Sequence, residues 1–198
     1  MKSTSVTFLD ETLKASVVLW RFLNGMRRLW APWRMEYIKS INEKPKGCIF
    51  CEKAKEADDE KNLIVYRGSE AFIMLNAYPY NSGHLMVAPY RHTPSLTDLN
   101  DQELLNVFKL VNLGIKALTL SMKPEGFNVG VNIGRAAGAG VAEHVHVHVV
   151  PRWAGDTNFM PVIGEVKVLP ELLRNTWLKV REALNSLTLC RSRSDLTL

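Results

Sequence analysis

The sequence predicts an α+β domain built on a five-stranded antiparallel sheet, with one long helix and one C-terminal helix. Two patterns support this prediction. Five short segments rich in apolar and β-branched residues are bounded by turn-forming residues, as strands are. Two longer segments repeat their apolar residues with helical spacing. A chain of 198 residues with 46% hydrophobic residues is long enough to bury one compact core and carry flanking pieces.

The five predicted strands span approximately residues 63–67, 71–76, 84–89, 127–133 and 144–150. A single long helix separates the third strand from the fourth, and the other connections are short, which favours antiparallel pairing. The stretch before the first strand, residues 53–61, is charged and predicts a short helix or a loop.

The long helix is predicted over about residues 101–121. Asn100 followed by Glu103 resembles a capping box, with Asn in the place of Ser or Thr. Apolar residues then recur at spacings of 4, 3, 4 and 3, and we interpret them as a core-facing stripe rather than a cofactor groove: Leu104, Phe108, Val111, Ile115 and Leu118. A second helix is predicted over about 169–184, opened by Pro170 and carrying Leu172, Leu173, Trp177 and Val180.

The sequence His144-Val145-His146-Val147-His148 carries the strongest functional signal. Alternation with period two predicts a strand with the three histidines on one face, their rings roughly 6.5–7 Å apart. Three titratable rings in a row are costly to bury without partners. We therefore expect this face to be a metal site, with imidazoles as ligands, or a site of nucleophilic attack on phosphorus.

A glycine-rich and alanine-rich run, residues 134–140, leads into this strand. Such a run lets backbone N–H groups approach a phosphate closely, because no side chain stands in the way. The preceding strand alternates so that Asn128 and Asn132 share one face. Together these segments predict a phosphate-binding site.

These motifs resemble those of the histidine triad (HIT) superfamily of nucleotide hydrolases and transferases. Residues 144–150 match its His-x-His-x-His-x-x signature, and residues 75–89 resemble its nucleoside-binding segment. Residues 29–34 and 150–153 resemble the branch of diadenosine tetraphosphate phosphorylases and hydrolases. The resemblance covers roughly residues 26–185. It implies a HIT-like fold and a homodimer that pairs two sheets across a two-fold axis.

The resemblance also implies roles for individual residues. His146 would attack the α-phosphorus and become nucleotidylated, and His148 would hydrogen-bond or protonate the leaving oxygen. Asn76 matches the position that contacts the ribose hydroxyls, Asn132 a polar phosphate contact, and His84 a supporting histidine beside the triad. Relatives often carry Gln, Ser or Thr just before the triad, where this chain has Gly140 and Val141, so either backbone N–H groups serve instead or the contact is missing. The remaining substrate contacts are then expected from Gly138, Gly140, Val141 and Trp153, with Tyr78 and Tyr80 as further aromatic residues near the site.

Cys48 and Cys51 form a Cys-x-x-Cys pair, which is typical of half a zinc site or of a redox pair, or arises by coincidence. A zinc site would need two histidines, and His92 and His144 are the natural completions. Several HIT relatives, and the related galactose-1-phosphate uridylyltransferases, resemble this chain in using a Cys₂His₂ structural zinc. We therefore expect a closed, structural Zn²⁺ site with these four ligands.

The resemblance divides the chain into an N-terminal extension at 1–25, a HIT domain at 26–186 and a flexible tail at 187–198. If the start is mis-assigned at Met1, Met26 is the true first residue. The apolar stretch within residues 15–20 is too short to span a membrane. The net charge of +5 suits an anionic ligand, but the scattered basic residues do not predict nucleic-acid binding. Three cysteines without the spacing of disulfide pairs argue against a secreted disulfide framework, so we expect a cytoplasmic protein with no membrane or nucleic-acid partner.

Three functions fit these residues. The first is cleavage of a dinucleoside polyphosphate, such as diadenosine tetraphosphate, through a nucleotidyl-His146 intermediate that phosphate or water resolves. The second is hydrolysis of nucleoside phosphoramidates with the same residues. The third is a zinc-stabilised nucleotide-binding module with little turnover. The sequence leaves the acceptor and the base preference open.

Overall fold

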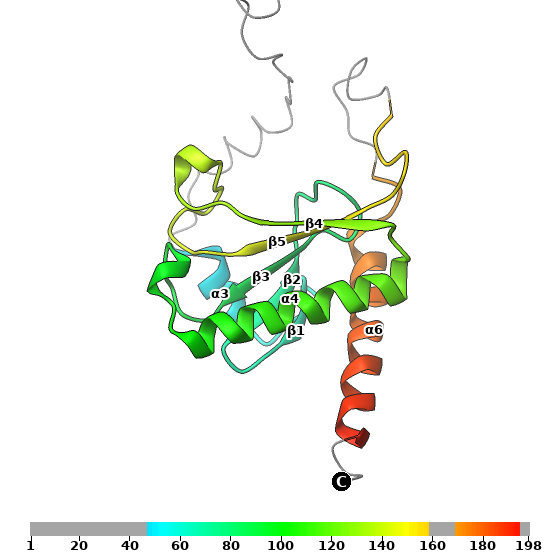
Figure 1. Cartoon of the computed structure of the whole chain (residues 1–198), viewed down its shortest axis with the longest axis horizontal. Helices are drawn as coiled ribbons and strands as arrows, with labels where there is room; N and C mark the ends of the chain where they lie inside the picture. Colours follow the sequence, from blue (N-terminus) through cyan, green and yellow to red (C-terminus); the bar gives the residue numbers. More distant parts are fainter. Residues whose placement is uncertain (1–46, 159–168, 195–198) are drawn as a thin grey trace, which may run out of the picture.

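A five-stranded antiparallel sheet forms the centre of the computed structural model, which describes residues 47–158 and 169–194 (Figure 1). The strands lie in the order β1-β2-β3-β5-β4. Their bounds are Ile64–Arg67 (β1), Ala71–Leu75 (β2), Leu85–Pro89 (β3), Gly126–Val131 (β4) and Val147–Arg152 (β5). The α+β architecture expected from the sequence is confirmed. The expected extension at 1–25 lies outside the described residues.

The strand register places a row of site residues across the middle of the sheet. Met74 pairs with Met86, Met86 with His148, and His148 with Gly130. Because paired residues in neighbouring strands point to the same face, Met74, Met86 and His148 share one face. The fifth strand begins only at Val147, so His144 and His146 lie in the segment that leads into it rather than in the ladder itself.

Alternation along the strands divides the core into two layers. On one face, Ile73, Val87 and Val149 pack with the long helix α4 (Asp101–Met122) and the C-terminal helix α6 (Leu173–Ser194). On the other face, the short helix α3 (Ile49–Lys55) inserts Phe50 against a smaller cluster: Ile64, Phe72, Met74, Met86 and Ala88. The candidate site lies on this second face.

Helix α4 begins with the predicted capping box. The Asn100 side chain accepts from the Glu103 N–H at 2.9 Å, and the Glu103 carboxylate accepts from the Asn100 N–H at 2.8 Å. Its buried face is Val107, Leu110, Val111, Gly114, Ala117 and Leu118. Phe108 is 46% exposed, so its assignment to the core was wrong. The stripe of α4 that packs on the sheet contains Val107, one residue before Phe108. Within this stripe, Gly114 allows close contact with Leu85.

Among the described residues, α4 is also the one helix long and apolar enough to cross a membrane by length and composition. Here it packs across β2, β3 and β5 and against α6, as the core helix of an α+β domain does.

Helix α6 begins later than expected, because Leu172 provides the carbonyl that accepts the N–H of Thr176 and so stands before the first helical residue. Residues 170–172 therefore lie outside the helix, and Leu172 is 74% exposed. Trp177 anchors α6 to the sheet by donating its indole N–H to the Ile64 carbonyl at 2.8 Å. The helix continues to Ser194, into the stretch for which a flexible tail was predicted.

Candidate active site

His146 is held with one ring nitrogen tied to the backbone and the other directed into a pocket. It is 4% exposed, and its Nδ1 lies 2.9 Å from the His144 carbonyl oxygen. Because a carbonyl only accepts, Nδ1 must carry the proton and donate it. In the neutral ring, Nε2 then keeps a free lone pair, which is the form that a nucleophile requires.

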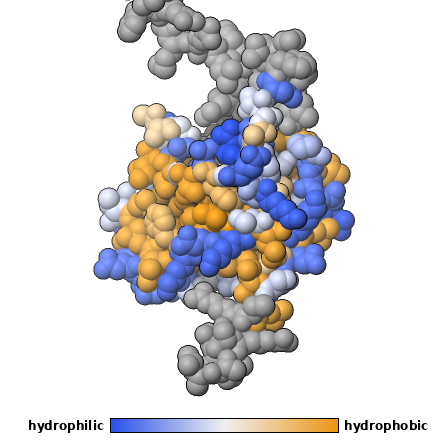
Figure 2. All heavy atoms as spheres, turned by 45° about the vertical axis from the view of Figure 1, so that its right-hand side comes forward, coloured by the Kyte–Doolittle hydropathy of each residue, from blue (hydrophilic) through white to orange (hydrophobic). Residues whose placement is uncertain are grey.

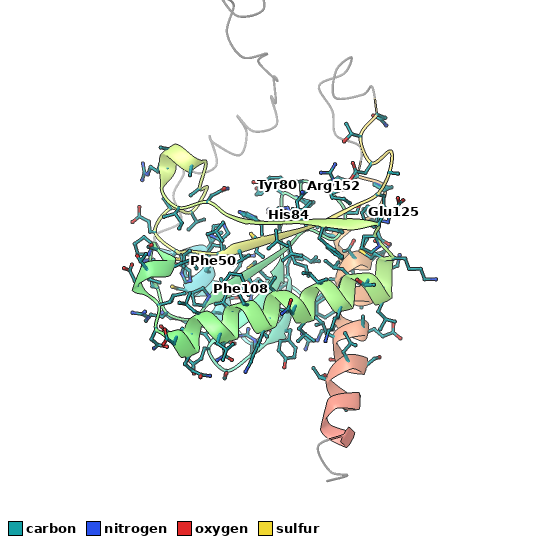
Figure 3. The ribbon with its side chains drawn as sticks, viewed as in Figure 1. Phe50, Tyr80, His84, Phe108, Glu125 and Arg152 are labelled. Atoms are coloured by element: carbon teal, nitrogen blue, oxygen red, sulfur yellow. The ribbon has the colours of Figure 1, made fainter. Side chains whose placement is uncertain are left out.

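His148 has the opposite tautomer, set by a chain of hydrogen bonds through His84. The Tyr80 N–H donates to His84 Nδ1 at 3.1 Å, so the proton of neutral His84 is on Nε2. That Nε2 donates to His148 Nδ1 at 3.0 Å. His148 therefore carries its proton on Nε2 and is a hydrogen-bond donor. Figure 3 places Tyr80 and His84 together on this side of the sheet, and their ring centroids are 4.5 Å apart.

Burial keeps these rings neutral. Removal from water lowers the pKa of His84 to about 3 and that of His148 to about 4, with neighbouring histidines adding to the effect. Burial also lowers the pKa of His146, although its hydrogen bond to the His144 carbonyl opposes the shift. At neutral pH the site thus presents an unprotonated nucleophile, His146, beside a neutral donor, His148.

The rings are closer than an ideal strand predicts. The centroids of His146 and His148 are 4.8 Å apart and nearly perpendicular, against the expected 6.5–7 Å. His144 does not join this pair, because Phe50 packs between them, 5.1 Å from His144 and 4.7 Å from His146. The three histidines therefore belong to two separate sites, with His146 and His148 in one and His144 in the other, and the Phe50 ring lies between them.

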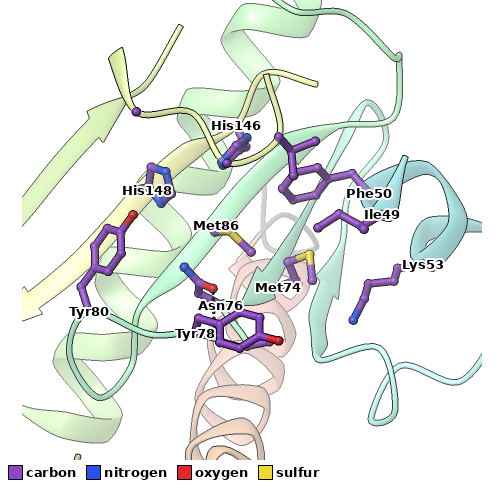
Figure 4. Close-up of a pocket in the computed structure, with 14 residues that line it drawn as sticks. Ile49, Phe50, Lys53, Met74, Asn76, Tyr78, Tyr80, Met86, His146 and His148 are labelled. Carbon is purple, nitrogen blue, oxygen red and sulfur yellow. Dashed lines mark hydrogen bonds between the residues drawn. The ribbon is translucent and has the colours of Figure 1, made fainter. Parts of the chain in front are cut away.

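A pocket opens in front of His146 and His148 (Figure 4). It contains four of the residues predicted to bind substrate: Asn76, Gly138, Gly140 and Val141. Three predicted residues lie elsewhere. His84 is fully buried behind His148, Trp153 donates its indole N–H to the Lys123 carbonyl beside a separate cavity, and Asn132 does not line the pocket.

Asn76 stands at the edge of this pocket in a fixed orientation. Its Oδ1 accepts from the Tyr78 N–H at 2.9 Å, and its Nδ2 donates toward His84 Nδ1 at 3.3 Å. The second N–H of the amide and the second lone pair of the oxygen are left for a ligand. A polar group fixed in this way suits recognition of a hydroxyl, as the ribose assignment requires.

Sequence reasoning missed the apolar wall of the pocket. Helix α3 supplies Ile49, Phe50 and Lys53, and the sheet supplies Met74 and Met86. Figure 4 shows the α3 residues on one side and His148 with Tyr80 on the other. The available signal was the pair between the two cysteines, since Ile49 and Phe50 are the central residues of the Cys-x-x-Cys motif and lie on the same short helix as Cys51.

The four predicted metal ligands converge on the far side of Phe50. The ligand atoms of Cys48, Cys51, His92 and His144 all lie within 4.8 Å of one another. His144 Nδ1 is 3.3 Å from the Cys48 sulfur and 3.5 Å from the Cys51 sulfur, and His92 Nδ1 is 3.4 Å from the Cys51 sulfur.

This geometry fits a tetrahedral zinc ion. Bonds of about 2.3 Å to sulfur and about 2.0 Å to nitrogen at tetrahedral angles imply S···N separations of roughly 3.5 Å. The His144 ring has the correct tautomer, because its Nε2–H donates to the Pro89 carbonyl at 2.9 Å and leaves the Nδ1 lone pair toward the thiols. Burial and the adjacent Cys48 raise the pKa of the Cys51 thiol, so a bound cation is what would favour the thiolate.

Comparison with known proteins finds histidine triad proteins both by sequence and by structure. The family model of the HIT domain matches residues 57–155. The chain is 44% identical to AP-4-A phosphorylase of Mycobacterium tuberculosis over 157 residues, which are 76% of this chain and 80% of that protein. It is 35% identical to a HIT-like protein of Methanocaldococcus jannaschii over 61% of this chain and 89% of that protein.

Among solved structures, a Zn-bound histidine triad family protein from Mycobacterium smegmatis superposes with a TM-score of 0.59 at 26% identity, covering 73% of this chain and 97% of that one. A histidine triad nucleotide-binding protein from Sulfolobus tokodaii superposes with a TM-score of 0.57 at 28% identity, covering 71% and 93%.

Proposed function

Because this chain belongs to the HIT family, we propose that it cleaves dinucleoside polyphosphates through a nucleotidyl intermediate on His146. The observation that carries the proposal is the pair of opposite tautomers at the pocket. A free Nε2 lone pair on His146 lies beside an Nε2–H donor on His148, 4.8 Å between ring centroids. One ring is prepared to attack and the other to donate.

The reaction follows in two balanced steps. His146 Nε2 attacks the α-phosphorus, a P–N bond forms, and the P–O bond to the leaving nucleotide breaks while the Nε2–H of His148 donates a hydrogen bond to the departing anionic phosphate oxygen. In the second step, an anionic oxygen of phosphate, or a water that loses its proton to solvent, attacks the same phosphorus. The P–N bond then breaks, and both histidines return to their starting forms.

Backbone groups at the entrance are assigned to the phosphoryl oxygens. Gly138 has a left-handed conformation at φ 88°, which glycine adopts without strain. Gly138 and Gly140 both line the pocket, so N–H groups in this loop can approach an anion closely. This is the function proposed for the loop in place of the side-chain donors that relatives carry.

Zinc is proposed as a structural ion at Cys48, Cys51, His92 and His144. With four protein ligands, it would hold α3 against the segment before β5 and leave no position for water. Its presence in the M. smegmatis relative supports this assignment. The chemical steps above use none of these four side chains.

A homodimer is proposed as the assembly. Strand β4 is an edge of the sheet, and exposed apolar side chains lie on it and on α4: Leu105, Phe108, Leu120 and Val129. Figure 2 shows a broad apolar area on one face of the molecule. An open edge beside exposed apolar groups favours association. Light scattering of the purified protein measures the assembly directly, and a monomer at micromolar concentration would contradict it.

The deciding experiment supplies diadenosine tetraphosphate with and without inorganic phosphate and separates the products. The identity to an AP-4-A phosphorylase favours phosphorolysis, so we expect ADP and ATP only when phosphate is present. AMP and ATP without phosphate would identify water as the acceptor instead. No cleavage in either reaction would overturn the proposal and favour nucleoside phosphoramidates as substrates.

A further inference from the structure

The nucleotide pocket contains one charged side chain that the proposed chemistry does not use, Lys53. It projects from α3, is half-buried, and lines the pocket together with Ile49 and Phe50 from the same helix. Ile49, Phe50 and Met74 beside it are apolar, and Figure 4 shows the hydroxyl of Tyr78 turned toward the same side of the pocket. A cation kept at the wall of an apolar pocket needs an acceptor to compensate for lost hydration.

In the described part of the chain, that acceptor is not a carboxylate paired with Lys53. Within residues 47–158 and 169–194, none of the ion pairs includes Lys53. The acid three residues further on, Glu56, is engaged by the Lys61 ammonium at 3.3 Å and the Asn62 amide at 2.9 Å. The Lys53 ammonium therefore has hydrogen-bonding capacity left for a bound ligand.

The position of Lys53 identifies the part of the ligand that it meets. In Figure 4 its nitrogen lies on the side of the pocket away from His146 and His148. The reacting phosphorus must be beside His146, and Asn76 is assigned to the ribose. A nucleoside extending from the phosphate past Asn76 places its base among Phe50, Met74 and Met86, with the outer edge of the base toward Lys53.

We propose that Lys53 is a specificity-determining residue that reads this edge of the base and favours 6-oxopurines over adenine. The inference rests on the proposed function, because it assumes that a nucleotide occupies this pocket. An ammonium has three donors and no acceptor. Hypoxanthine and guanine present O6 and N7, which are both acceptors. Adenine presents N7 beside an amino group, which is itself a donor. An N–H of the ammonium would then face an N–H of the adenine amino group, and neither can accept a hydrogen bond.

Binding of IMP and AMP tests the inference, since these nucleotides differ in the purine ring only at position 6 and its adjacent N1 proton. Isothermal titration should give IMP an affinity about tenfold higher than AMP, because a hydrogen bond from a charged donor at a partly exposed site contributes at the lower end of its range. Lys53→Met should reduce this ratio to about one. Lys55→Met is the matched control, because it removes the same charge from an exposed position of the same helix and should leave the ratio unchanged.

The outcomes separate the two proposals. If neither nucleotide binds the wild-type protein, the proposed function itself fails. If both bind with equal affinity, or if Lys53→Met weakens both by the same factor, the nucleotide site stands and the base-reading role of Lys53 is overturned. A preference for IMP that survives Lys53→Met would also overturn it.

Discussion

The carbonyl oxygen of His144 lies 2.9 Å from Nδ1 of His146, so one residue serves two sites. The side chain of His144 faces the two thiols, and its backbone fixes the proton of the neighbouring nucleophile. The His144 ring is in turn fixed by the Pro89 carbonyl at 2.9 Å. The metal cluster and the candidate nucleophile are therefore joined through two residues of backbone and through Phe50, whose ring contacts both imidazoles.

Replacement of the nucleophile gives the first prediction. His146→Ala should lower kcat by more than about 10³-fold, because it removes the proposed nucleophile and the neighbouring His148 carries a proton on Nε2 with its Nδ1 occupied by His84. Nucleotide binding should remain measurable, since the contacts proposed for the base and the ribose come from other residues. Rapid-quench kinetics and titration with AMP measure the two effects separately. Substantial turnover in this variant would exclude His146 as the nucleophile.

The chain from Tyr80 through His84 to His148 gives the second prediction. His84→Leu removes the donor that fixes the His148 tautomer and should lower kcat by about 10–100-fold with little change in KM, the range seen when the partner that orients a functional histidine is lost. His84→Gln restores an amide donor and should recover part of the rate. If both variants lose stability but keep the wild-type kcat, His84 has only a packing role.

Removal of the metal gives the third prediction. Helix α3 carries Cys51 toward the metal cluster and Phe50 and Lys53 toward the pocket. We therefore expect that chelation, or Cys51→Ala, lowers the melting temperature and also weakens AMP binding, because the helix loses the ligand that holds it in place. Adding Zn²⁺ to the chelated protein should restore both.

Cys190→Ser is the control for this experiment, because Cys190 belongs to α6 and is not one of the four ligands proposed for zinc. Its zinc content, measured by elemental analysis, should equal that of the wild-type protein. A protein that carries no zinc, or whose AMP affinity is the same with and without zinc, would contradict the coupling.

Local patterns in the sequence were sufficient for the strands and the helix caps. Val147 and Val149 alternate with His148 across the sheet as predicted, and the Asn100 capping box forms. These features depend on residues a few positions apart. The prediction for Phe108 failed because apolar residues outnumber buried positions on α4, and only contact with the sheet decides which of two adjacent stripes is buried.

In the candidate site, too, some features could be predicted from the sequence and others depend on tertiary contacts. The convergence of Cys48, Cys51, His92 and His144 followed from motif spacing and resemblance, and the structure brings all four together. The separation of the two sites by Phe50 and the position of Lys53 could not be predicted from the sequence, because both depend on how α3 docks on the sheet. This docking brings together residues far apart in the chain, such as Phe50 and His146, about 95 positions apart. Period-two alternation also gave the wrong ring spacing, since His146 precedes the regular strand.

Acid sensitivity is the last prediction. Burial lowers the pKa of His84 to about 3 and of His148 to about 4, from 6.5 for an unperturbed ring. Between pH 6.5 and 4 the unfolded chain therefore binds protons that the folded protein excludes. The free energy of unfolding must then fall as the pH falls, by up to about 1.4 kcal/mol per pH unit for each such histidine. Urea denaturation at pH 7, 6 and 5 measures this slope.

His84→Gln provides the comparison, because it removes one of these groups and leaves the thiols, His92 and His144 unchanged in the same zinc buffer. Any proton release linked to metal binding is then common to both proteins. The stability of the variant should decline less steeply with falling pH than that of the wild-type protein. Equal slopes would mean that His84 takes up its proton in the folded protein over the same pH range as in the unfolded chain. In that case Nδ1 could not accept from the Tyr80 N–H, and the tautomer assigned to His148 would have to be abandoned.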